Sequence, residues 1–122
     1  MKKILIVDDN EKNRKLLKVI IESHGYETVE ADNGKEGVRL ARESKPLLIL
    51  MDIQMPVMDG IEAAKILKSE AETAGIPVIA VTSYAMKGDR EKFLATGIND
   101  YIAKPIDVNE VISIIDKYSH GE

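Results

Sequence analysis

The chain has 122 residues, 44% of them hydrophobic and 31% charged, a balance typical of a single globular domain in water. Its formal net charge of −4 argues against direct binding of nucleic acid, and the lack of cysteine excludes disulfides, thiolate metal sites and thiol nucleophiles. No apolar run is long enough for a membrane span or a secretion signal. We therefore expect a cytoplasmic protein that is not inserted into a membrane.

The first strand is predicted at residues 4–7, a continuous apolar run that ends on Asp8 and Asp9. A helix is expected next, at about residues 10–23, because apolar residues there recur with helical spacing. The residues expected on its buried face are Leu16, Leu17, Ile20, Ile21 and His24.

Alternating polar and apolar residues at 27–31 indicate a strand at the edge of a sheet. A second helix, at about residues 34–43, is expected to begin at an N-cap, Asn33. The third strand is predicted at residues 47–51, an apolar run that ends on Asp52.

The third helix is predicted to begin after an N-cap at Asp59 and to end before Gly75. The residues expected on its inner face are Ile61, Ala64, Leu67 and Ala71. The fourth strand, at residues 78–81, is again continuously apolar and ends on Thr82.

A fourth helix is expected at about residues 86–96, and a short edge strand at residues 101–103 ends on Lys104. The last helix is predicted to begin at an N-cap, Asp107. Its apolar stripe is expected to contain Val108, Val111, Ile112, Ile115 and Tyr118.

Five alternating strands and helices predict an α/β fold, since right-handed crossovers place parallel strands in one sheet with helices on two faces. The expected architecture is a flavodoxin-like, doubly wound, five-stranded parallel sheet of order 2-1-3-4-5 with five helices. In that order the first and third strands are neighbours, and ligands bind at the carboxyl ends of such strands.

Five polar side chains are thereby expected at one edge of the sheet: Asp8, Asp9, Asp52, Thr82 and Lys104. Clustered carboxylates repel one another, and a divalent cation relieves that repulsion. Oxygen ligands without histidine or cysteine favour magnesium, manganese or calcium, and a site with so few carboxylates is typical of Mg²⁺. A carboxylate such as Asp52 can attack a phosphoryl group, whose charge Lys104 and Thr82 would help to stabilise.

These motifs resemble those of response-regulator receiver domains. The matching segments are residues 7–10 (VDDN), 51–56 (MDIQMP), 59–60 (DG), 81–83 (VTS) and 101–105 (YIAKP), and the resemblance covers nearly the whole chain. It implies that Asp52 accepts a phosphoryl group from a histidine kinase or a histidine phosphotransfer protein. It also implies that Asp8, Asp9 and Asp52 hold Mg²⁺, for which Mn²⁺ can substitute, with the backbone carbonyl of Gln54 as a further ligand.

The resemblance assigns a switching role to Thr82 and Tyr101, and it implies that Lys104 pairs with the phosphoryl group and precedes a cis peptide bond. Gln54 and Tyr84 occupy the two positions expected to tune the lifetime of the phosphoryl group. Both are bulky, so we expect slow self-dephosphorylation.

The partner surfaces are expected in two places. Asn13 and Arg14 on the first helix would face the histidine donor, and Ile106 and Ile114, together with Tyr101, would contact a downstream protein target. The resemblance further implies one receiver domain over residues 1–122 without an output domain, either monomeric or dimerising on phosphorylation. Such a domain is not an enzyme beyond catalysing its own phosphorylation and dephosphorylation.

Two other functions are open at this point. An interaction-only pseudo-receiver would have the same fold, although such a protein would be expected to lack the acids that are present here. A phosphohydrolase of the haloacid dehalogenase type also uses an aspartyl phosphate, but it requires a second acid two residues after the nucleophile, where this chain has Gln54.

Overall fold

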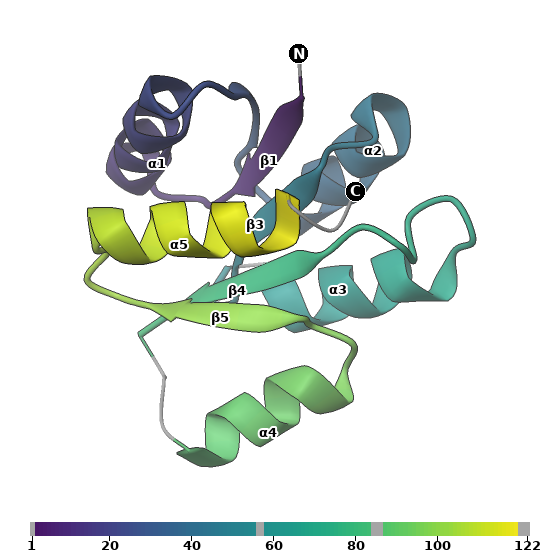
Figure 1. Ribbon diagram of the computed structural model, residues 1–122. Helices are drawn as coiled ribbons and strands as arrows, with labels where there is room; N and C mark the ends of the chain where they lie inside the picture. Colours follow the sequence, from purple (N-terminus) through teal and green to yellow (C-terminus); the bar gives the residue numbers. More distant parts are fainter. Residues whose placement is uncertain (1, 56–57, 84–86, 120–122) are drawn as a thin grey trace.

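A computed structural model of the chain describes residues 2–55, 58–83 and 87–119. Five parallel strands form one sheet in the order β2-β1-β3-β4-β5, as predicted, and helices alternate with them along the chain (Figure 1). The strands are β1 (Lys3–Val7), β2 (Glu27–Ala31), β3 (Leu48–Asp52), β4 (Val78–Thr82) and β5 (Asp100–Ala103). The helices are α1 (Glu11–Ser23), α2 (Gly34–Ser44), α3 (Gly60–Ser69), α4 (Lys87–Ala95) and α5 (Val108–Ser119).

The central strands are the continuously apolar ones. Every residue of β3 and β4 is buried, as is all of β1 except Lys3, whereas the edge strands β2 and β5 are only partly buried. A strand covered by helices on both faces needs apolar side chains at successive positions, which explains why these three runs show no alternation. The predicted division into central and edge strands is confirmed.

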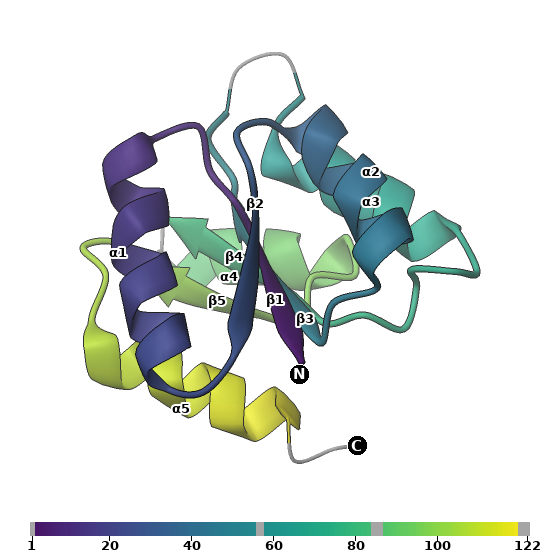
Figure 2. The same cartoon turned by 90° about the horizontal axis from the view of Figure 1, so that it is seen from above.

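Helices cover both faces of the sheet (Figure 2). Alternate side chains of β1 and β3 form one core with α1 and α5, and the intervening side chains form a second core with α2, α3 and α4. On the second face Gly37 lies against Val7, and a Cβ at this glycine would be 2.8 Å from a methyl carbon of Val7. Glycine therefore allows α2 to approach β1 closely.

Side-chain caps set where the helices begin. Asn33, Asp59 and Asp107 each accept a hydrogen bond from the backbone N–H three residues on, as the sequence predicted, and Asn10 does the same for α1. Each cap satisfies a backbone donor that has no partner within the helix, a contribution of about 1 kcal/mol. These caps fix the loops that lead from the carboxyl edge of the sheet into the helices.

Three details of the predicted core are wrong. Leu16 is 42% exposed, because α1 packs on the sheet through Leu17, Ile20 and Ile21. Val108 is 48% exposed in the first turn of α5. Ala71 is exposed because α3 ends at Ser69 rather than continuing toward Gly75. None of the helices described is both long and apolar enough to cross a membrane.

Candidate functional site

The neighbouring strands β1 and β3 bring three carboxylates together at the carboxyl edge of the sheet. Val7 pairs with Met51 in the parallel register, so the acids that follow on the two strands lie side by side. Asp8, Asp9 and Asp52 each offer a carboxylate oxygen, and these oxygens all lie within 4.8 Å of one another. The structure therefore assembles the acidic cluster that was predicted at the switch point of the sheet.

Asp8 is 1% exposed, and its two carboxylate oxygens differ. Oδ1 accepts a hydrogen bond of 2.8 Å from the backbone N–H of Asn10, whereas Oδ2 is buried without a hydrogen-bond partner in the described part of the chain. Burial, assisted by the charge of Asp52, raises the pKa of Asp8 from 3.8 to about 6, against the lowering effects of the Asn10 N–H and of Lys104. A buried carboxylate oxygen without a partner is costly, and a divalent cation would satisfy it.

Asp52, at the end of β3, is 2% exposed, and its Oδ1 atom is held by two donors. The backbone N–H of Gln54 donates to Oδ1 at 3.0 Å, and the ammonium of Lys104 lies 3.4 Å from the same oxygen. The exposed Asp9 completes the cluster on its open side. The donors are three carboxylates without sulfur or imidazole, a set that fits Mg²⁺.

Gly60 packs closely against the backbone of Asp52 and Ile53. Its N–H donates to the carbonyl of Ile53 at 3.2 Å, and a Cβ at this position would lie 2.9 Å from the Cα of Ile53 and still closer to the carbonyl oxygen of Asp52. Real Cβ atoms do not approach backbone that closely. Gly60 therefore allows the start of α3 to pack against the end of β3, a role that sequence reasoning missed.

Thr82 and Lys104 reach the site from β4 and β5. Thr82 is fully buried at the end of β4, and its carbonyl accepts a 2.9 Å hydrogen bond from the backbone N–H of Lys104. The Lys104–Pro105 peptide bond is cis, as the resemblance implied. All five side chains predicted from the ends of the strands thus lie at one edge of the sheet.

Gln54 spans from the β3–α3 loop to the β4–α4 loop. Its side-chain oxygen accepts a 3.4 Å hydrogen bond from the backbone N–H of Ser83. This contact joins the loop that follows Asp52 to the loop that follows Thr82. Tyr84, the second residue expected to tune phosphoryl lifetime, lies outside the described residues.

The residues predicted to contact a downstream target pack against both cores of the molecule. Tyr101 is half-buried and packs against the core beneath α2, α3 and α4, whereas Ile106 and Ile114 are half-buried against the core beneath α1 and α5. Asn13 is partly exposed, but the guanidinium of Arg14 binds groups of its own chain instead of facing outward. The residues predicted to contact a target therefore come from both sides of β5, a strand at the edge of the sheet.

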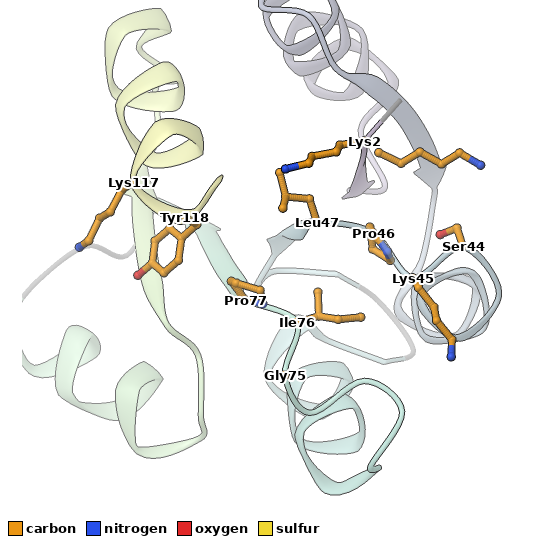
Figure 3. A pocket seen from close by; sticks show the side chains of 11 residues that line it. Lys2, Ser44, Lys45, Pro46, Leu47, Gly75, Ile76, Pro77, Lys117 and Tyr118 are labelled. Carbon is orange, nitrogen blue, oxygen red and sulfur yellow. The ribbon is translucent and has the colours of Figure 1, made fainter. Parts of the chain in front are cut away.

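A cavity of about 580 Å³ lies at the opposite, amino edge of the sheet. Its charged lining residues within the described ranges are Lys2, Lys3, Lys45 and Lys117. Figure 3 shows the side chains of Lys45 and Lys117 pointing away from each other, and Lys117 lies 3.1 Å from a carboxylate oxygen of Asp100. Among the described residues no carboxylate lines this basic cavity, which is separate from the acidic site.

The chain is thus a doubly wound α/β protein with three acids at the switch point of its sheet and a lysine beside them, a set of groups suited to a divalent cation and a phosphoryl group. The family model for the response regulator receiver domain matches residues 4–116. The chain belongs to this family, whose members act as phosphorylation-dependent signalling switches.

Relatives of known structure and name support this placement. The chain is 51% identical to the polar-differentiation response regulator DivK of Brucella anthropi over 117 residues, which cover 96% of this chain and 95% of that protein. It is 35% identical to the receiver domain of a sensor histidine kinase from Pseudomonas aeruginosa, with a TM-score of 0.88 and 96% of each chain covered. That structure has a magnesium ion coordinated in its active site cleft. The chemotaxis protein CheY4 of Vibrio cholerae shares the fold, with a TM-score of 0.91 at 24% identity, and covers 97% of this chain and 98% of its own.

Proposed function

We propose that Asp52 accepts a phosphoryl group from a phosphohistidine and that the resulting aspartyl phosphate switches the binding of a downstream protein. The observation that carries this proposal is the position of Asp52, which is buried between a pair of acids and the ammonium of Lys104. A carboxylate next to a cation site and a lysine has what phosphoryl transfer requires, namely a nucleophile and positive charge around it.

In the proposed reaction a carboxylate oxygen of Asp52 attacks phosphorus while the N–P bond of the donor breaks, leaving its electron pair on the imidazole. Two donors already hold Oδ1, which favours Oδ2 as the attacking oxygen. Mg²⁺, held by Asp8, Asp9, Asp52 and the carbonyl of Gln54, would neutralise charge on the phosphoryl oxygens. The same site would accept Mn²⁺ in place of Mg²⁺.

Lys104 and Thr82 would then bind the new phosphoryl group. The ammonium of Lys104 is within reach of it, because it already lies 3.4 Å from Asp52, and the Thr82 hydroxyl would donate a hydrogen bond. We propose that the Thr82 hydroxyl moves toward the phosphoryl group and that the half-buried Tyr101 ring then turns inward. The chain would thus catalyse only its own phosphorylation and dephosphorylation, as one receiver domain over residues 1–122.

The exposed side of α1 is our candidate for the surface that contacts the histidine donor. Val19 is 66% exposed and Leu16 is 42% exposed, and both lie on the same helix as the partly exposed Asn13. These two side chains are three residues apart and so are neighbours on the helix surface, where together they offer an apolar area to which another protein could bind. We propose that Ile106 and Ile114, with Tyr101, contact the downstream target. We also propose that the protein is a monomer or that it dimerises on phosphorylation.

We also propose that the protein is cytoplasmic and does not bind nucleic acid directly. Both statements are predictions from composition and charge. The phosphohydrolase alternative is disfavoured because Gln54 places an amide where that chemistry needs an acid. An interaction-only receiver is the second candidate, and it differs from the first in one measurable property. It would bind partners without ever carrying a phosphoryl group.

The test is incubation with acetyl phosphate, with and without Mg²⁺, followed by intact-mass measurement. We expect one phosphoryl adduct that requires Mg²⁺ and that disappears in Asp52→Asn. Asp59→Asn is a matched control, because Asp59 is a helix cap on the same loop and asparagine also caps helices. Absence of any adduct on the wild-type protein would favour the interaction-only alternative.

A further inference from the structure

We infer that Arg14 is a positioning residue for the cation site, acting through the backbone that joins Asp8 to Asp9. This inference rests on the proposed function of the acidic cluster as a magnesium site. Arg14 lies in the first turns of α1, and its guanidinium reaches back over the loop from which the helix begins. The guanidinium would therefore control the orientation of the backbone that carries Asp8 and Asp9.

The Arg14 side chain joins α1 to the β1–α1 loop and to β2. Its Nη1 atom donates a 2.8 Å hydrogen bond to the backbone carbonyl of Asp8, and its Nε atom lies 3.4 Å from a carboxylate oxygen of Glu30 on β2. Only 18% of the side chain is exposed, so the guanidinium is held in place rather than free in solvent. Hydrogen bonds from a charged donor are roughly twice as strong as neutral ones.

The carbonyl that Arg14 binds belongs to the peptide group between Asp8 and Asp9. That peptide group is planar, so fixing its oxygen also fixes the direction in which the backbone N–H and Cα of Asp9 lie. Asp9 is exposed, in contrast to the buried Asp8, and therefore has less packing to orient it. The hydrogen bond from Arg14 supplies an orientation that packing does not.

Other bonds hold the preceding part of the same loop. The backbone N–H of Asp8 donates to the carbonyl of Ala31 at 3.1 Å, and Oδ1 of Asp8 accepts from the N–H of Asn10 at 2.8 Å. These bonds fix Asp8, and the guanidinium of Arg14 extends the same restraint to Asp9. Groups that orient metal ligands from outside the coordination sphere commonly change metal affinity by about 10- to 100-fold when removed.

Glu30 explains how a cation can be tolerated so near a metal site. Its carboxylate lies next to the guanidinium of Arg14, and its second oxygen is 3.8 Å from the ammonium of Lys18. The negative charge of Glu30 offsets that of the guanidinium, so Arg14 can orient the loop with little net repulsion of Mg²⁺. Arg14 and Lys18 thus share one acid, but of these two cations it is Arg14 that donates to the Asp8 carbonyl.

This difference gives a matched pair of variants. We would measure the Kd for Mg²⁺ of the unphosphorylated protein by isothermal titration calorimetry in wild type, Arg14→Ala, Arg14→Met and Lys18→Ala. Both Arg14 variants are expected to bind Mg²⁺ about tenfold more weakly. Lys18→Ala also removes a positive charge that lies beside Glu30, but it leaves the hydrogen bond to the Asp8 carbonyl in place. We expect this variant to bind Mg²⁺ as tightly as wild type or slightly more tightly.

Arg14→Lys keeps both the positive charge and a hydrogen-bond donor, whereas Arg14→Ala and Arg14→Met lose both. Arg14→Lys is therefore expected to recover part of the lost affinity, which a merely electrostatic effect on the cation would not produce. Arg14→Met keeps an apolar stem and carries the test should the alanine variant fail to fold. An Arg14 variant that is folded and binds Mg²⁺ as tightly as Lys18→Ala would overturn the inference.

The outcome is distinguishable from failure of the proposed function. A wild-type protein that binds Mg²⁺ but is never phosphorylated at Asp52 would refute the phosphoryl-switch proposal while the Arg14 comparison still stands. A wild-type protein that shows no Mg²⁺ binding in the titration would refute both.

Discussion

Replacing Asp8 with asparagine is expected to stabilise the magnesium-free protein at neutral pH. Burial raises the pKa of Asp8 from 3.8 to about 6 in the folded state. The folded protein therefore holds this proton more tightly than the unfolded chain does. Between these two pKa values the folded state binds more protons, so the free energy of unfolding falls as the pH rises through about 4 to 6.

The magnitude follows from the size of the pKa change. A rise from 3.8 to about 6 corresponds to about 3 kcal/mol of lost stability once the pH exceeds the folded-state value. An asparagine side chain in place of Asp8 would remove the charge and keep an oxygen that can accept the hydrogen bond from the N–H of Asn10. Asp8→Asn should thus recover a large part of about 3 kcal/mol above about pH 7 and almost none below about pH 4.

The assay is urea unfolding in EDTA across this pH range, repeated with Mg²⁺. Saturating Mg²⁺ at about 100 times its Kd should stabilise the wild-type protein by about 2.7 kcal/mol and the asparagine variant by much less. Asp9→Asn is the control, since Asp9 is exposed and its replacement should change the metal-free stability by about 0.5 kcal/mol or less. An Asp8→Asn variant no more stable than wild type in EDTA above about pH 7 would show that this reasoning is wrong.

Three further predictions concern the loop, the packing and the partner surface. Gln54→Ala should shorten the lifetime of the phosphoryl group, because it removes a bulky side chain that bridges the loop after Asp52 to Ser83 and so should ease the entry of water. A half-life equal to or longer than that of wild type, measured by loss of radiolabel, would contradict this prediction. Gly60→Ala should cost about 1–3 kcal/mol of stability in urea unfolding, since its Cβ would overlap the backbone of β3. Val19→Glu should slow transfer from a phosphorylated histidine donor while labelling by acetyl phosphate stays at the wild-type rate; equal slowing of both would place the effect at the chemical site.

The central strands and the main site residues were predictable because one sequence pattern indicates both. Each central strand is a continuous apolar run, and the residue after the run is polar. Once the strands are parallel, their carboxyl ends share an edge, so Asp8, Asp52 and Thr82 must lie close together. The comparison with known receivers confirms the family but was not needed to place these side chains.

The parts that sequence missed depend on how elements pack. The outward direction of Leu16 reflects the rotation of α1 about its own axis, which is set by the contacts of Leu17 and Ile21 and not by helical spacing alone. The end of α3 at Ser69 is accompanied by a pair of hydrogen bonds from Arg42 of α2 to the carboxylate of Glu70, a contact between distant segments.

Long side chains and glycines were also beyond the reach of pattern analysis. Arg14 was expected to face the histidine donor from the surface of the first helix. Its length allows it to reach the Asp8 carbonyl instead, and nothing in the spacing of residues specifies that direction. Gly60 and Gly37 lie where a helix approaches a strand, a contact that becomes visible only when both elements are placed.

The most direct test of the phosphoryl-switch proposal is to locate the phosphoryl group chemically. The protein would be treated with acetyl phosphate in Mg²⁺, reduced with borohydride to convert an aspartyl phosphate into a stable alcohol, and mapped by peptide mass spectrometry. We expect reduction at Asp52 alone, and only when Mg²⁺ is present. Reduction at Asp8, Asp9 or another acid, or labelling of Asp52 that is independent of Mg²⁺, would contradict the proposal.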